Sequence, residues 1–298
     1  MNITLTGASG LIGRRLLADL QRAGHSLTVL SRHPAANLAP GIACVVWDPM
    51  QGPPPQESLL QTDAVIHLAG EPVAQRWTQD VKRRIRDSRV IGTRNLVQGI
   101  ANLRNKPKIM ISASAIGYYG SRGEEVLRES SPPAGTYLAD VCTSWEKEAA
   151  TAEPLGLRVV QIRIGLVLDA HGGALKSMLP PFRLALGGRL GDGQQWMSWI
   201  HLADLAALFE FALDHPVRGP LNGVAPHPVR NADFTQALAQ AVHRPAVFPM
   251  PIAALKLLFG EMSEILLASQ RVLPAAPQAA GFQFQFPELS SALSDVLS

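Results

Sequence analysis

Residues 3–13 read ITLTGASGLIG, an apolar β-prone run that ends in three glycines spaced three residues apart. The order strand, glycine turn, helix is the start of a βαβ unit and strongly limits the folds open to this chain. Gly7 can turn sharply, Gly10 lets a phosphate approach the backbone, and Gly13 lets a helix pack close to its strand. This stretch therefore predicts a loop that binds the pyrophosphate of a dinucleotide.

The predicted helix that begins near Leu11 supports this interpretation. Its free N–H groups and positive dipole end would face the phosphates, and the hydroxyl of Ser9 can add a further hydrogen bond. The alternative is a plain turn between a strand and a helix, without a ligand.

The end of the second predicted strand indicates which dinucleotide is bound. Sites selective for NAD usually place Asp or Glu here, but residues 27–41 contain no acid, and Ser31 and Arg32 follow the strand. A guanidinium fits a 2′-phosphate, which an acid would repel. The pattern favours NADP(H), and the alternative is an arginine that is merely solvated.

The first half of the chain alternates short apolar runs with helical patterns. This alternation predicts an α/β fold, a Rossmann-type doubly wound parallel sheet. The expected strands are residues 3–6, 26–31, 44–47, 64–68, 108–112 and 158–163, and the expected helices are 11–23, 79–103 and 139–153.

The alternation of short apolar runs and helical patterns ends near residue 165. We expect residues 1–165 to form the cofactor-binding domain, with later segments returning to it, and 166–298 to form a smaller C-terminal α/β lobe. Pro180-Pro181 and Gly187-Gly188 are expected to break regular structure. Helical patterns follow at 202–213, 231–242 and 252–267, with Asn231 as the N-cap of the second.

Composition excludes several classes of protein. Of the 298 residues, 47% are hydrophobic and 17% charged, which is typical of a globular protein, and the net charge of +3 is scattered. We expect no nucleic-acid partner, because a basic stripe is missing. No run of about 18 apolar residues occurs, so no membrane partner is expected. The two cysteines form no metal motif, and with no leader pattern at the N-terminus they indicate a cytoplasmic protein without a metal.

Motifs along most of the chain resemble those of one known family. TGASGLIG (6–13) and HLAG (67–70) are similar to segments of the extended short-chain dehydrogenases/reductases. SAIGYYG (114–120), WE (145–146), LPPFRLALGGRLGDGQQWMSWIHLADL (179–205) and GFQFQFPEL (281–289) resemble its atypical "epimerase family" branch. That branch carries a C-terminal domain of unknown function, which would occupy about residues 222–298.

The resemblance implies a map of cofactor contacts. It assigns the pyrophosphate to the glycine loop, the 2′-phosphate to the end of the second strand, and further contacts to the fourth strand, the long helix and two later strands. The implied residues are Gly7, Ser9, Gly10, Leu11, Ile12, Gly13, Ser31, Arg32, Leu68, Ala69, Gly70, Arg89, Ser112 and Arg163. For Arg163 the alternative is a buried ion pair.

The chain departs from the family in its catalytic residues. Working members use a hydroxyl residue and a tyrosine followed four residues later by lysine, whose charge lowers the tyrosine pKa from about 10. Ser114 matches the hydroxyl, but four residues after Tyr137 stands Val141. Tyr118 and Tyr119 are the remaining catalytic candidates, with packing against the cap as their alternative role.

Three further residues are candidates for the wall of a substrate pocket. Trp77 and Trp199 fall in predicted loops or helix starts, and His201 lies at the start of a helix, where a structural role satisfied by a nearby carboxylate is its alternative. The sequence thus predicts either an NADP(H)-dependent oxidoreductase or epimerase, or a non-catalytic NADP(H)-binding sensor. The expected partner is a small molecule that is anionic or linked to a nucleotide, and the protein is expected to be a monomer or a homodimer.

Overall fold

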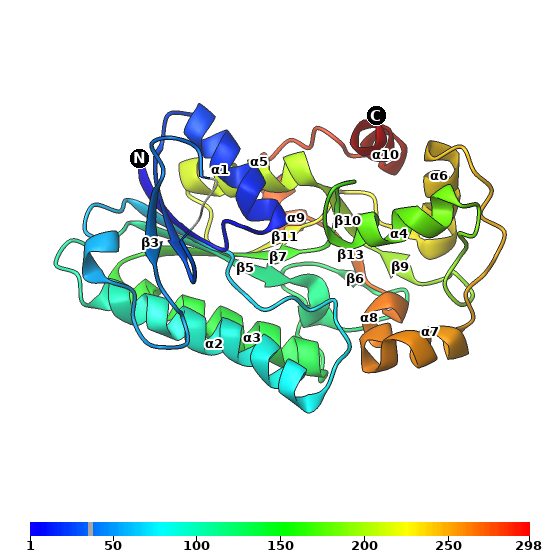
Figure 1. The fold of residues 1–298 in the computed structure, drawn as a ribbon, viewed down its shortest axis with the longest axis horizontal. Coiled ribbons are helices and arrows are strands. Elements are labelled where there is room, and N and C mark those ends of the chain that lie inside the picture. The colour runs from blue at the N-terminus through cyan, green and yellow to red at the C-terminus, as the bar shows by residue number, and fades with distance from the viewer. Residues whose placement is uncertain (35–37) are drawn as a thin grey trace.

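Seven parallel strands form the central sheet of the computed structural model, which describes residues 1–34 and 38–298 (Figure 1). Their order across the sheet is β3-β2-β1-β4-β5-β7-β11. They are β1 (Asn2–Thr6), β2 (Ser26–Ser31), β3 (Ala43–Val46), β4 (Ala64–His67), β5 (Ile109–Ala115), β7 (Arg158–Ile164) and β11 (Gly219–Gly223). The order reverses between β1 and β4, and in such sheets ligands bind where the carboxyl ends of these two strands meet.

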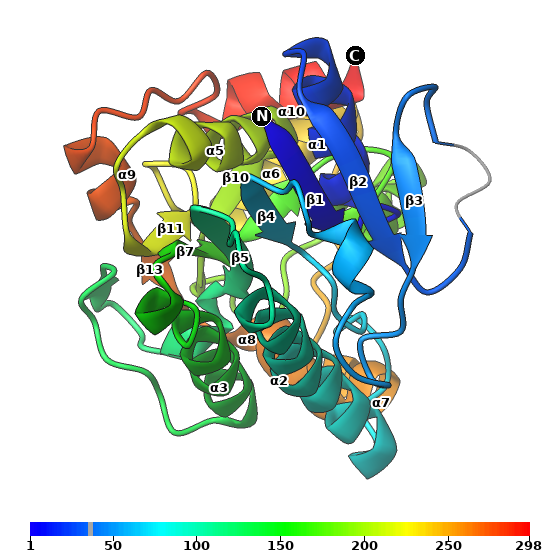
Figure 2. The ribbon, with the colours of Figure 1, turned by 90° about the vertical axis from the view of Figure 1, so that its left-hand side faces the viewer.

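Helices cover both faces of the sheet (Figure 2). α1 (Leu11–Arg22) and α5 (Leu202–Asp214) lie together on one face, and α2 (Gln79–Ala101) and α3 (Tyr137–Ala150) on the other. Short 3₁₀ helices lie at Gln56–Ser58, Ile116–Tyr119 and Glu153–Leu155. This architecture confirms the predicted Rossmann-type α/β fold.

The first helix shows why the sequence folds in this way. Its buried residues are Gly13, Leu16, Leu17 and Leu20, which have the spacing of one helix face. Leu16 and Leu20 are fully buried in one core cluster with sheet residues such as Leu5. The burial of this leucine stripe fixes the start of α1 directly after the glycines.

The later part of the chain, together with β6 from the first part, builds a second lobe beside the sheet. It contains the strand pairs β6 (Val126–Leu127) with β13 (Arg271–Val272), β8 (Leu166–Leu168) with β10 (Trp199–His201), and β9 (Trp196–Met197) with β12 (Val229–Arg230). Its helices are α4 (Gly173–Arg183), α6 (Asn231–Ala241), α7 (Ile252–Phe259), α8 (Ser263–Leu267), α9 (Ala275–Ala279) and α10 (Leu289–Leu297), with a 3₁₀ turn, η4 (Gly260–Met262). α5 and β11 return to the main sheet, so the two parts interlock.

Three sequence predictions about the lobe are wrong. The predicted helix 252–267 is divided into α7, η4 and α8, because Gly260 adopts a left-handed backbone with φ of 58°. Pro180 and Pro181 do not break α4, because they lie near its C-terminal end and their carbonyl groups still accept hydrogen bonds from Leu184 and Leu186. Asn231 does not cap α6, because its amide oxygen accepts from the N–H of Leu190.

The seventh strand, β11, escaped prediction altogether. Its sequence, GPLNG, contains residues that rarely form strands. β11 lies at the edge of the sheet and pairs in parallel with β7. Tertiary pairing therefore outweighs local preference there, as Pro220 on an edge strand illustrates.

Candidate active site

The glycine loop forms a tight cradle at the point where the strand order reverses. Gly7 has a φ of 73°, and a side chain there would lie 2.7 Å from the carbonyl carbon of Leu68. A side chain on Gly13 would lie 2.3 Å from the carbonyl oxygen of Gly7. Gly10 donates its N–H to that same oxygen at 3.1 Å. The first and third glycines are therefore required by close packing of the backbone.

The N-terminus of α1 opens onto this cradle. Gly10 is the N-cap, and no side chain caps the first turn. The first N–H groups of the helix therefore remain available to an anion. Ser9 and Gly10 are exposed, and Leu11 and Ile12 are half-buried. The loop thus has the access and the donors that a pyrophosphate requires.

Thr6 at the end of β1 links this strand to the end of β4 by hydrogen bonds, beside the glycine loop. Its hydroxyl oxygen accepts the N–H groups of Leu68 and Ala69, each at 3.2 Å, and lies 2.7 Å from Nδ1 of His67. Since this oxygen already accepts two protons, its own proton goes to Nδ1, which leaves the ring proton on Nε2 to be donated to Thr93 at 2.9 Å. Burial, with a smaller contribution from the charge of Arg89, lowers the pKa of His67 to about 4, so the ring is neutral.

Ser31 and Arg32 lie at the carboxyl end of β2, next to the glycine loop after β1. The two strands are paired in register up to Thr6 and Leu30. Ser31 is half-buried, and Arg32 is exposed. Both residues are placed where the second strand of a dinucleotide-binding unit ends.

Arg89 extends from α2 to the segment after β4. Its Nη1 donates to the carbonyl oxygens of Glu71 at 2.9 Å and Ile85 at 3.0 Å, and its guanidinium lies 5.1 Å from the ring centre of Trp145. A side chain on Gly70 would lie 3.0 Å from the guanidinium carbon. Burial lowers the pKa of Arg89. Within the described residues, the indole N–H of Trp145 is a buried donor without a partner.

A buried polar network occupies the carboxyl end of β5 and β7. Ser114 donates to a carboxylate oxygen of Glu146 at 2.7 Å, and Arg163 holds both oxygens of the same carboxylate at 2.8 Å. Nη1 of Arg163 donates to the hydroxyl of Tyr119 at 2.9 Å, which in turn donates to Asn222 at 2.7 Å. The network thus joins the candidate catalytic serine and tyrosine to a charged pair.

This network changes the roles predicted for two of its residues. Arg163 is 3% exposed and also donates to the carbonyl of Glu129 at 3.1 Å, so the alternative of a buried ion pair describes its surroundings. Burial alone would lower the pKa of Arg163, but the bonds to Glu146 outweigh this and raise it. Tyr119 is fully buried, and burial raises its pKa to about 12. As the structure stands, its hydroxyl is poorly suited to act as a catalytic base.

The other two tyrosines, Tyr118 and Tyr137, are less buried than Tyr119. Tyr118 is half-buried, with the guanidinium of Arg163 at 3.5 Å from its ring centre. Tyr137 donates to the carbonyl oxygen of Lys82 at 2.6 Å, and burial raises its pKa. Val141, in the lysine position, is buried in α3. Of the three tyrosines, Tyr118 has no hydrogen bond to the described residues that would hold its hydroxyl.

Ser112, a cofactor contact implied by the resemblance, lies inside the sheet. Ser112 is 1% exposed within β5 and donates to the carbonyl oxygen of Ala113 at 3.1 Å. The nearby thiol of Cys142 is buried, and burial raises its pKa to about 11, which keeps it in the neutral form.

The structure buries the three side chains that the sequence suggested for a pocket wall. Trp199 is fully buried, and its indole donates to the carbonyl of His227 at 3.1 Å. Trp77 is 8% exposed and donates to Val73 at 3.0 Å. His201 caps α5 by accepting from Ala203, lies 3.1 Å from the carboxylate of Asp295, and is 4% exposed. All three side chains fill the interior, because the tail of the chain packs over them.

Sequence reasoning missed Glu146 and Asn222. Glu146 lies on α3 and Asn222 on β11, the strand that was not predicted. The available signal for Glu146 was an acidic residue next to Trp145 in a predicted helix, since the predicted strand that follows contains an arginine, Arg163. For Asn222 no local signal exists.

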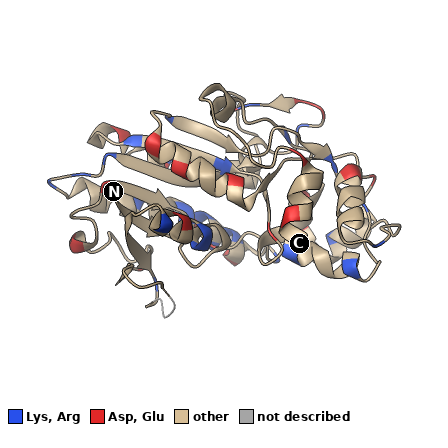
Figure 3. Cartoon of the chain, turned by 90° about the horizontal axis from the view of Figure 1, so that it is seen from above, with Lys and Arg blue, Asp and Glu red and all other residues tan. Residues whose placement is uncertain are grey.

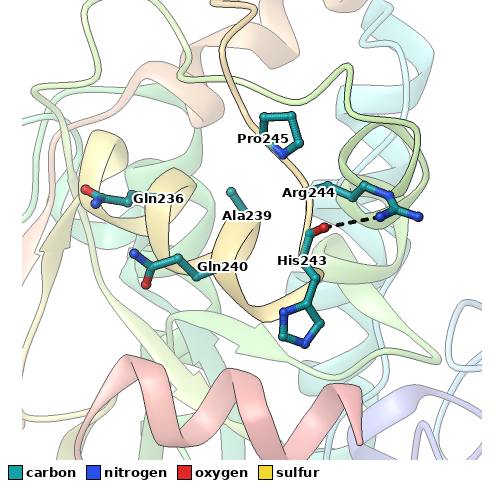
Figure 4. A pocket seen from close by; sticks show the side chains of 6 residues that line it. All are labelled: Gln236, Ala239, Gln240, His243, Arg244 and Pro245. Carbon is teal, nitrogen blue, oxygen red and sulfur yellow. Dashed lines mark hydrogen bonds between the residues drawn. The ribbon is translucent and has the colours of Figure 1, made fainter.

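Other surface features do not coincide with the glycine loop. An open hollow of about 610 Å³ lies along α6 and the residues after it, and Figure 4 shows its lining: Gln236, Ala239, Gln240, His243, Arg244 and Pro245. Figure 3 shows basic and acidic residues interspersed over the helices. Among residues 1–34 and 38–298, no cluster of three acidic, histidine or cysteine side chains could hold a metal ion. No helix in the same residues has both the length and the apolar character needed to cross a bilayer.

A parallel sheet in this order, with a glycine cradle where the order reverses, defines a dinucleotide-binding protein of the Rossmann class. The profile of the family described as "NAD dependent epimerase/dehydratase family" matches residues 3–225, and that of a domain of unknown function, DUF1731, matches residues 250–296. The chain therefore belongs to the NAD dependent epimerase/dehydratase family.

Known relatives extend the match over the whole chain. The epimerase family protein SDR39U1 homolog, chloroplastic, of Arabidopsis thaliana is 39% identical over 100% of this chain and 87% of its own length. The epimerase family protein YfhF of Bacillus subtilis is 36% identical, with 100% and 98% covered. The crystal structure of human epimerase family protein SDR39U1 with NADPH has a TM-score of 0.89 and 34% identity, and covers 100% of this chain and 99% of that one.

Proposed function

We propose that this chain binds NADP(H) at the glycine loop and acts as an oxidoreductase or epimerase-like enzyme on a small molecule. The observation that carries the proposal is the backbone cradle of Gly7 and Gly13 beneath an uncapped helix N-terminus. The human relative crystallised with NADPH, which shares this fold along its whole length, supports the choice of cofactor.

The residues present fit this cofactor. The loop N–H groups and Ser9 would hold the pyrophosphate, Ser31 and Arg32 the 2′-phosphate, and the backbone of 68–70 the adenosine side. When bound, NADPH supplies a hydride. Arg89 would place a half-buried positive charge beside Gly70, in a site that lacks the usual lysine.

A cofactor titration tests the binding half of the proposal. Fluorescence or calorimetric titration should give tighter binding of NADPH than of NADH. Arg32→Ala should weaken NADPH binding about tenfold to a hundredfold, the value of a charge-assisted contact, and leave NADH binding unchanged. Arg22→Ala is the matched control, because Arg22 is an exposed arginine at the far end of α1. Equal affinities for the two cofactors would refute the role of Arg32.

The catalytic half concerns Ser114 and Tyr118. We propose that the Tyr118 hydroxyl moves the proton, and that Ser114 is positioned for the substrate by Glu146. NADPH-loaded protein should oxidise its cofactor with a member of an aldehyde, ketone and quinone panel. Tyr118→Phe and Ser114→Ala should slow this turnover while NADPH affinity stays the same. Unchanged turnover in both variants would remove these residues from the site.

The second candidate function is a non-catalytic NADP(H) sensor. It is favoured by Val141 in the lysine position and by the complete hydrogen bonding of Tyr119. Tight NADPH binding without turnover on any carbonyl substrate would select it over the enzyme.

Substrate, assembly and compartment also belong to this proposal. The substrate is taken to be anionic or linked to a nucleotide, and the protein to be a monomer or a homodimer. A cytoplasmic setting is proposed because both cysteines, Cys44 and Cys142, are free. Fractionation of the native cells would test the compartment, and sedimentation would test the assembly.

A further inference from the structure

Exposed apolar side chains gather on one part of the second lobe. Eight large apolar residues there are between 36% and 80% exposed, with Leu257 the most exposed. We call them the apolar surface: Leu184, Leu186, Val247, Phe248, Met250, Ile252, Leu257 and Leu258. Scattered single residues of this kind are ordinary, but a concentration in two short segments marks an interaction site.

Backbone pairing joins these two segments into one surface. Phe248 donates its N–H to Gly187 at 3.3 Å, Met250 donates to Arg189 at 2.9 Å, and Gly191 donates to Met250 at 2.9 Å. The paired strip leads directly into α7, which lies at the outer edge of the lobe (Figure 1). In α7 only Leu255 is buried and Phe259 packs against the cluster around Trp77, whereas Ile252, Leu257 and Leu258 are exposed.

Basic side chains lie within the two segments of the apolar surface, and acidic side chains such as Asp192 and Glu264 lie only beyond their ends. Residues 170–191 and 234–260 contain no Asp or Glu, whereas they contain Lys176, Arg183, Arg189, Arg244 and Lys256. The acid that follows α7, Glu261, pairs with Lys82 of α2. Arg183, Arg189 and Lys256 are exposed. Three exposed basic side chains therefore lie beside the apolar surface, which favours an anionic partner.

We propose that the apolar surface docks this protein on a membrane that carries anionic lipids. A second copy of the chain is disfavoured, because a symmetric contact would bring two sets of basic side chains together. An acidic protein partner is disfavoured by composition: the surface is aliphatic with one phenylalanine and lacks the Trp and Tyr that anchor protein interfaces. Protruding Leu, Ile and Phe side chains with Lys and Arg beside them are typical of segments that lie in the membrane interface.

Contact with a membrane surface differs from the expectation in the sequence analysis that the protein has no membrane partner. The sequence lacks a run of about 18 apolar residues, a property that has no bearing on contact with the surface of a bilayer. The apolar surface forms only when residues 184–191 meet residues 247–252, so no continuous stretch of sequence displays it. Docking also leaves the proposed NADP(H) site unchanged and stands independently of it.

Vesicle sedimentation tests the proposal with the intact protein. Vesicles of equal parts phosphatidylglycerol and phosphatidylcholine should carry the protein into the pellet, and vesicles of phosphatidylcholine alone should not. Leu257→Asp should lower the binding constant at least tenfold. Arg189→Gln and Lys256→Gln should each lower it about fivefold, as should a rise in salt. Leu60→Asp is the matched control, since Leu60 is 55% exposed but lies before β4, outside the apolar surface.

Each other outcome overturns the proposal. One such outcome is that the protein stays in the supernatant with anionic vesicles, and another is that it pellets equally with both vesicle types. A third is that the Leu257→Asp and Leu60→Asp variants bind anionic vesicles with the same affinity. A dimer in sedimentation equilibrium that Leu257→Asp dissociates would assign the surface to a second copy. Melting temperatures of the variants, which should match the parent because all the altered side chains are exposed, verify that each variant is folded.

Discussion

Replacing Glu146 with alanine removes the carboxylate from a buried guanidinium. The side chain of Arg163 is 4% exposed and that of Glu146 13% exposed, so little water reaches the pair. Two nitrogen atoms of Arg163 and the hydroxyl of Ser114 would lose their acceptor. Removal of one partner from a buried ion pair costs about 3–5 kcal/mol, so we expect the free energy of unfolding to fall by this amount.

Urea unfolding followed by tryptophan fluorescence measures this loss. The double variant Glu146→Leu with Arg163→Met removes both charges and leaves none unpaired, so it should recover most of the stability lost by Glu146→Ala. The matched control is Arg83→Gln, which breaks an ion pair whose side chains are 67% and 68% exposed and should change stability by less than about 0.5 kcal/mol.

Two results would refute this reasoning. A loss below about 1 kcal/mol for Glu146→Ala would mean that water solvates Arg163 well in the folded protein. The double variant could also lose more free energy of unfolding than the two single variants lose together. That result would mean that the shape of the side chains, rather than their charge, determines the effect.

Three further predictions concern the loop, the buried histidine and the thiols. Gly13→Ala should abolish NADPH binding and lower the melting temperature, because its side chain meets a backbone oxygen at 2.3 Å, whereas Gly135→Ala, with no atom within 4 Å, should alter neither. The pKa of His67 is about 4 when folded and 6.5 ordinarily, so the unfolded chain binds more protons between these values. Above about pH 6.5 the ring is neutral in both states, so the contribution of His67 to the free energy of unfolding is fully present. This free energy should fall by about 3 kcal/mol as the pH drops to 4. Urea unfolding of His67→Gln should not show this loss. Because burial raises the pKa of Cys142 to about 11, a thiol reagent at neutral pH should label half-buried Cys44 in the folded protein and Cys142 only after unfolding.

Each of these predictions has an outcome that contradicts it. Normal NADPH affinity in Gly13→Ala would show that the cradle can relax. A pH dependence in His67→Gln as steep as that of the parent would assign the acid sensitivity to other groups. Labelling of Cys142 at the rate of Cys44 would show that α3 opens readily in the folded state.

Local patterns predicted the main sheet and the cofactor loop well. Six of the seven main-sheet strands and the first helix are visible from apolar periodicity within a few residues, and the glycine spacing in 7–13 needs no distant partner to be understood. The edge strand β11 was missed because GPLNG has no strand preference of its own. The helix 252–267 was overextended, because periodicity does not reveal that Gly260 adopts a left-handed backbone.

The candidate site was predictable only where it is local. The contacts of Ser114 with Glu146 and of Tyr119 with Asn222 join residues 32 and 103 positions apart, and no spacing rule relates such pairs. Trp199 and His201 look like pocket residues at a helix start. Packing against distant segments of the chain, with His227 accepting from Trp199 and Asp295 beside His201, made them interior instead.

By itself, therefore, the sequence of this protein determined a parallel sheet, a glycine loop at the end of its first strand, and the lack of a lysine four residues after Tyr137. Those properties depend on backbone geometry and on neighbours within a few residues. Only the tertiary structure decided which polar groups are buried and paired, and which apolar side chains remain exposed. Burial depends on what the rest of the chain places around a residue, and that information is distributed over all 298 positions.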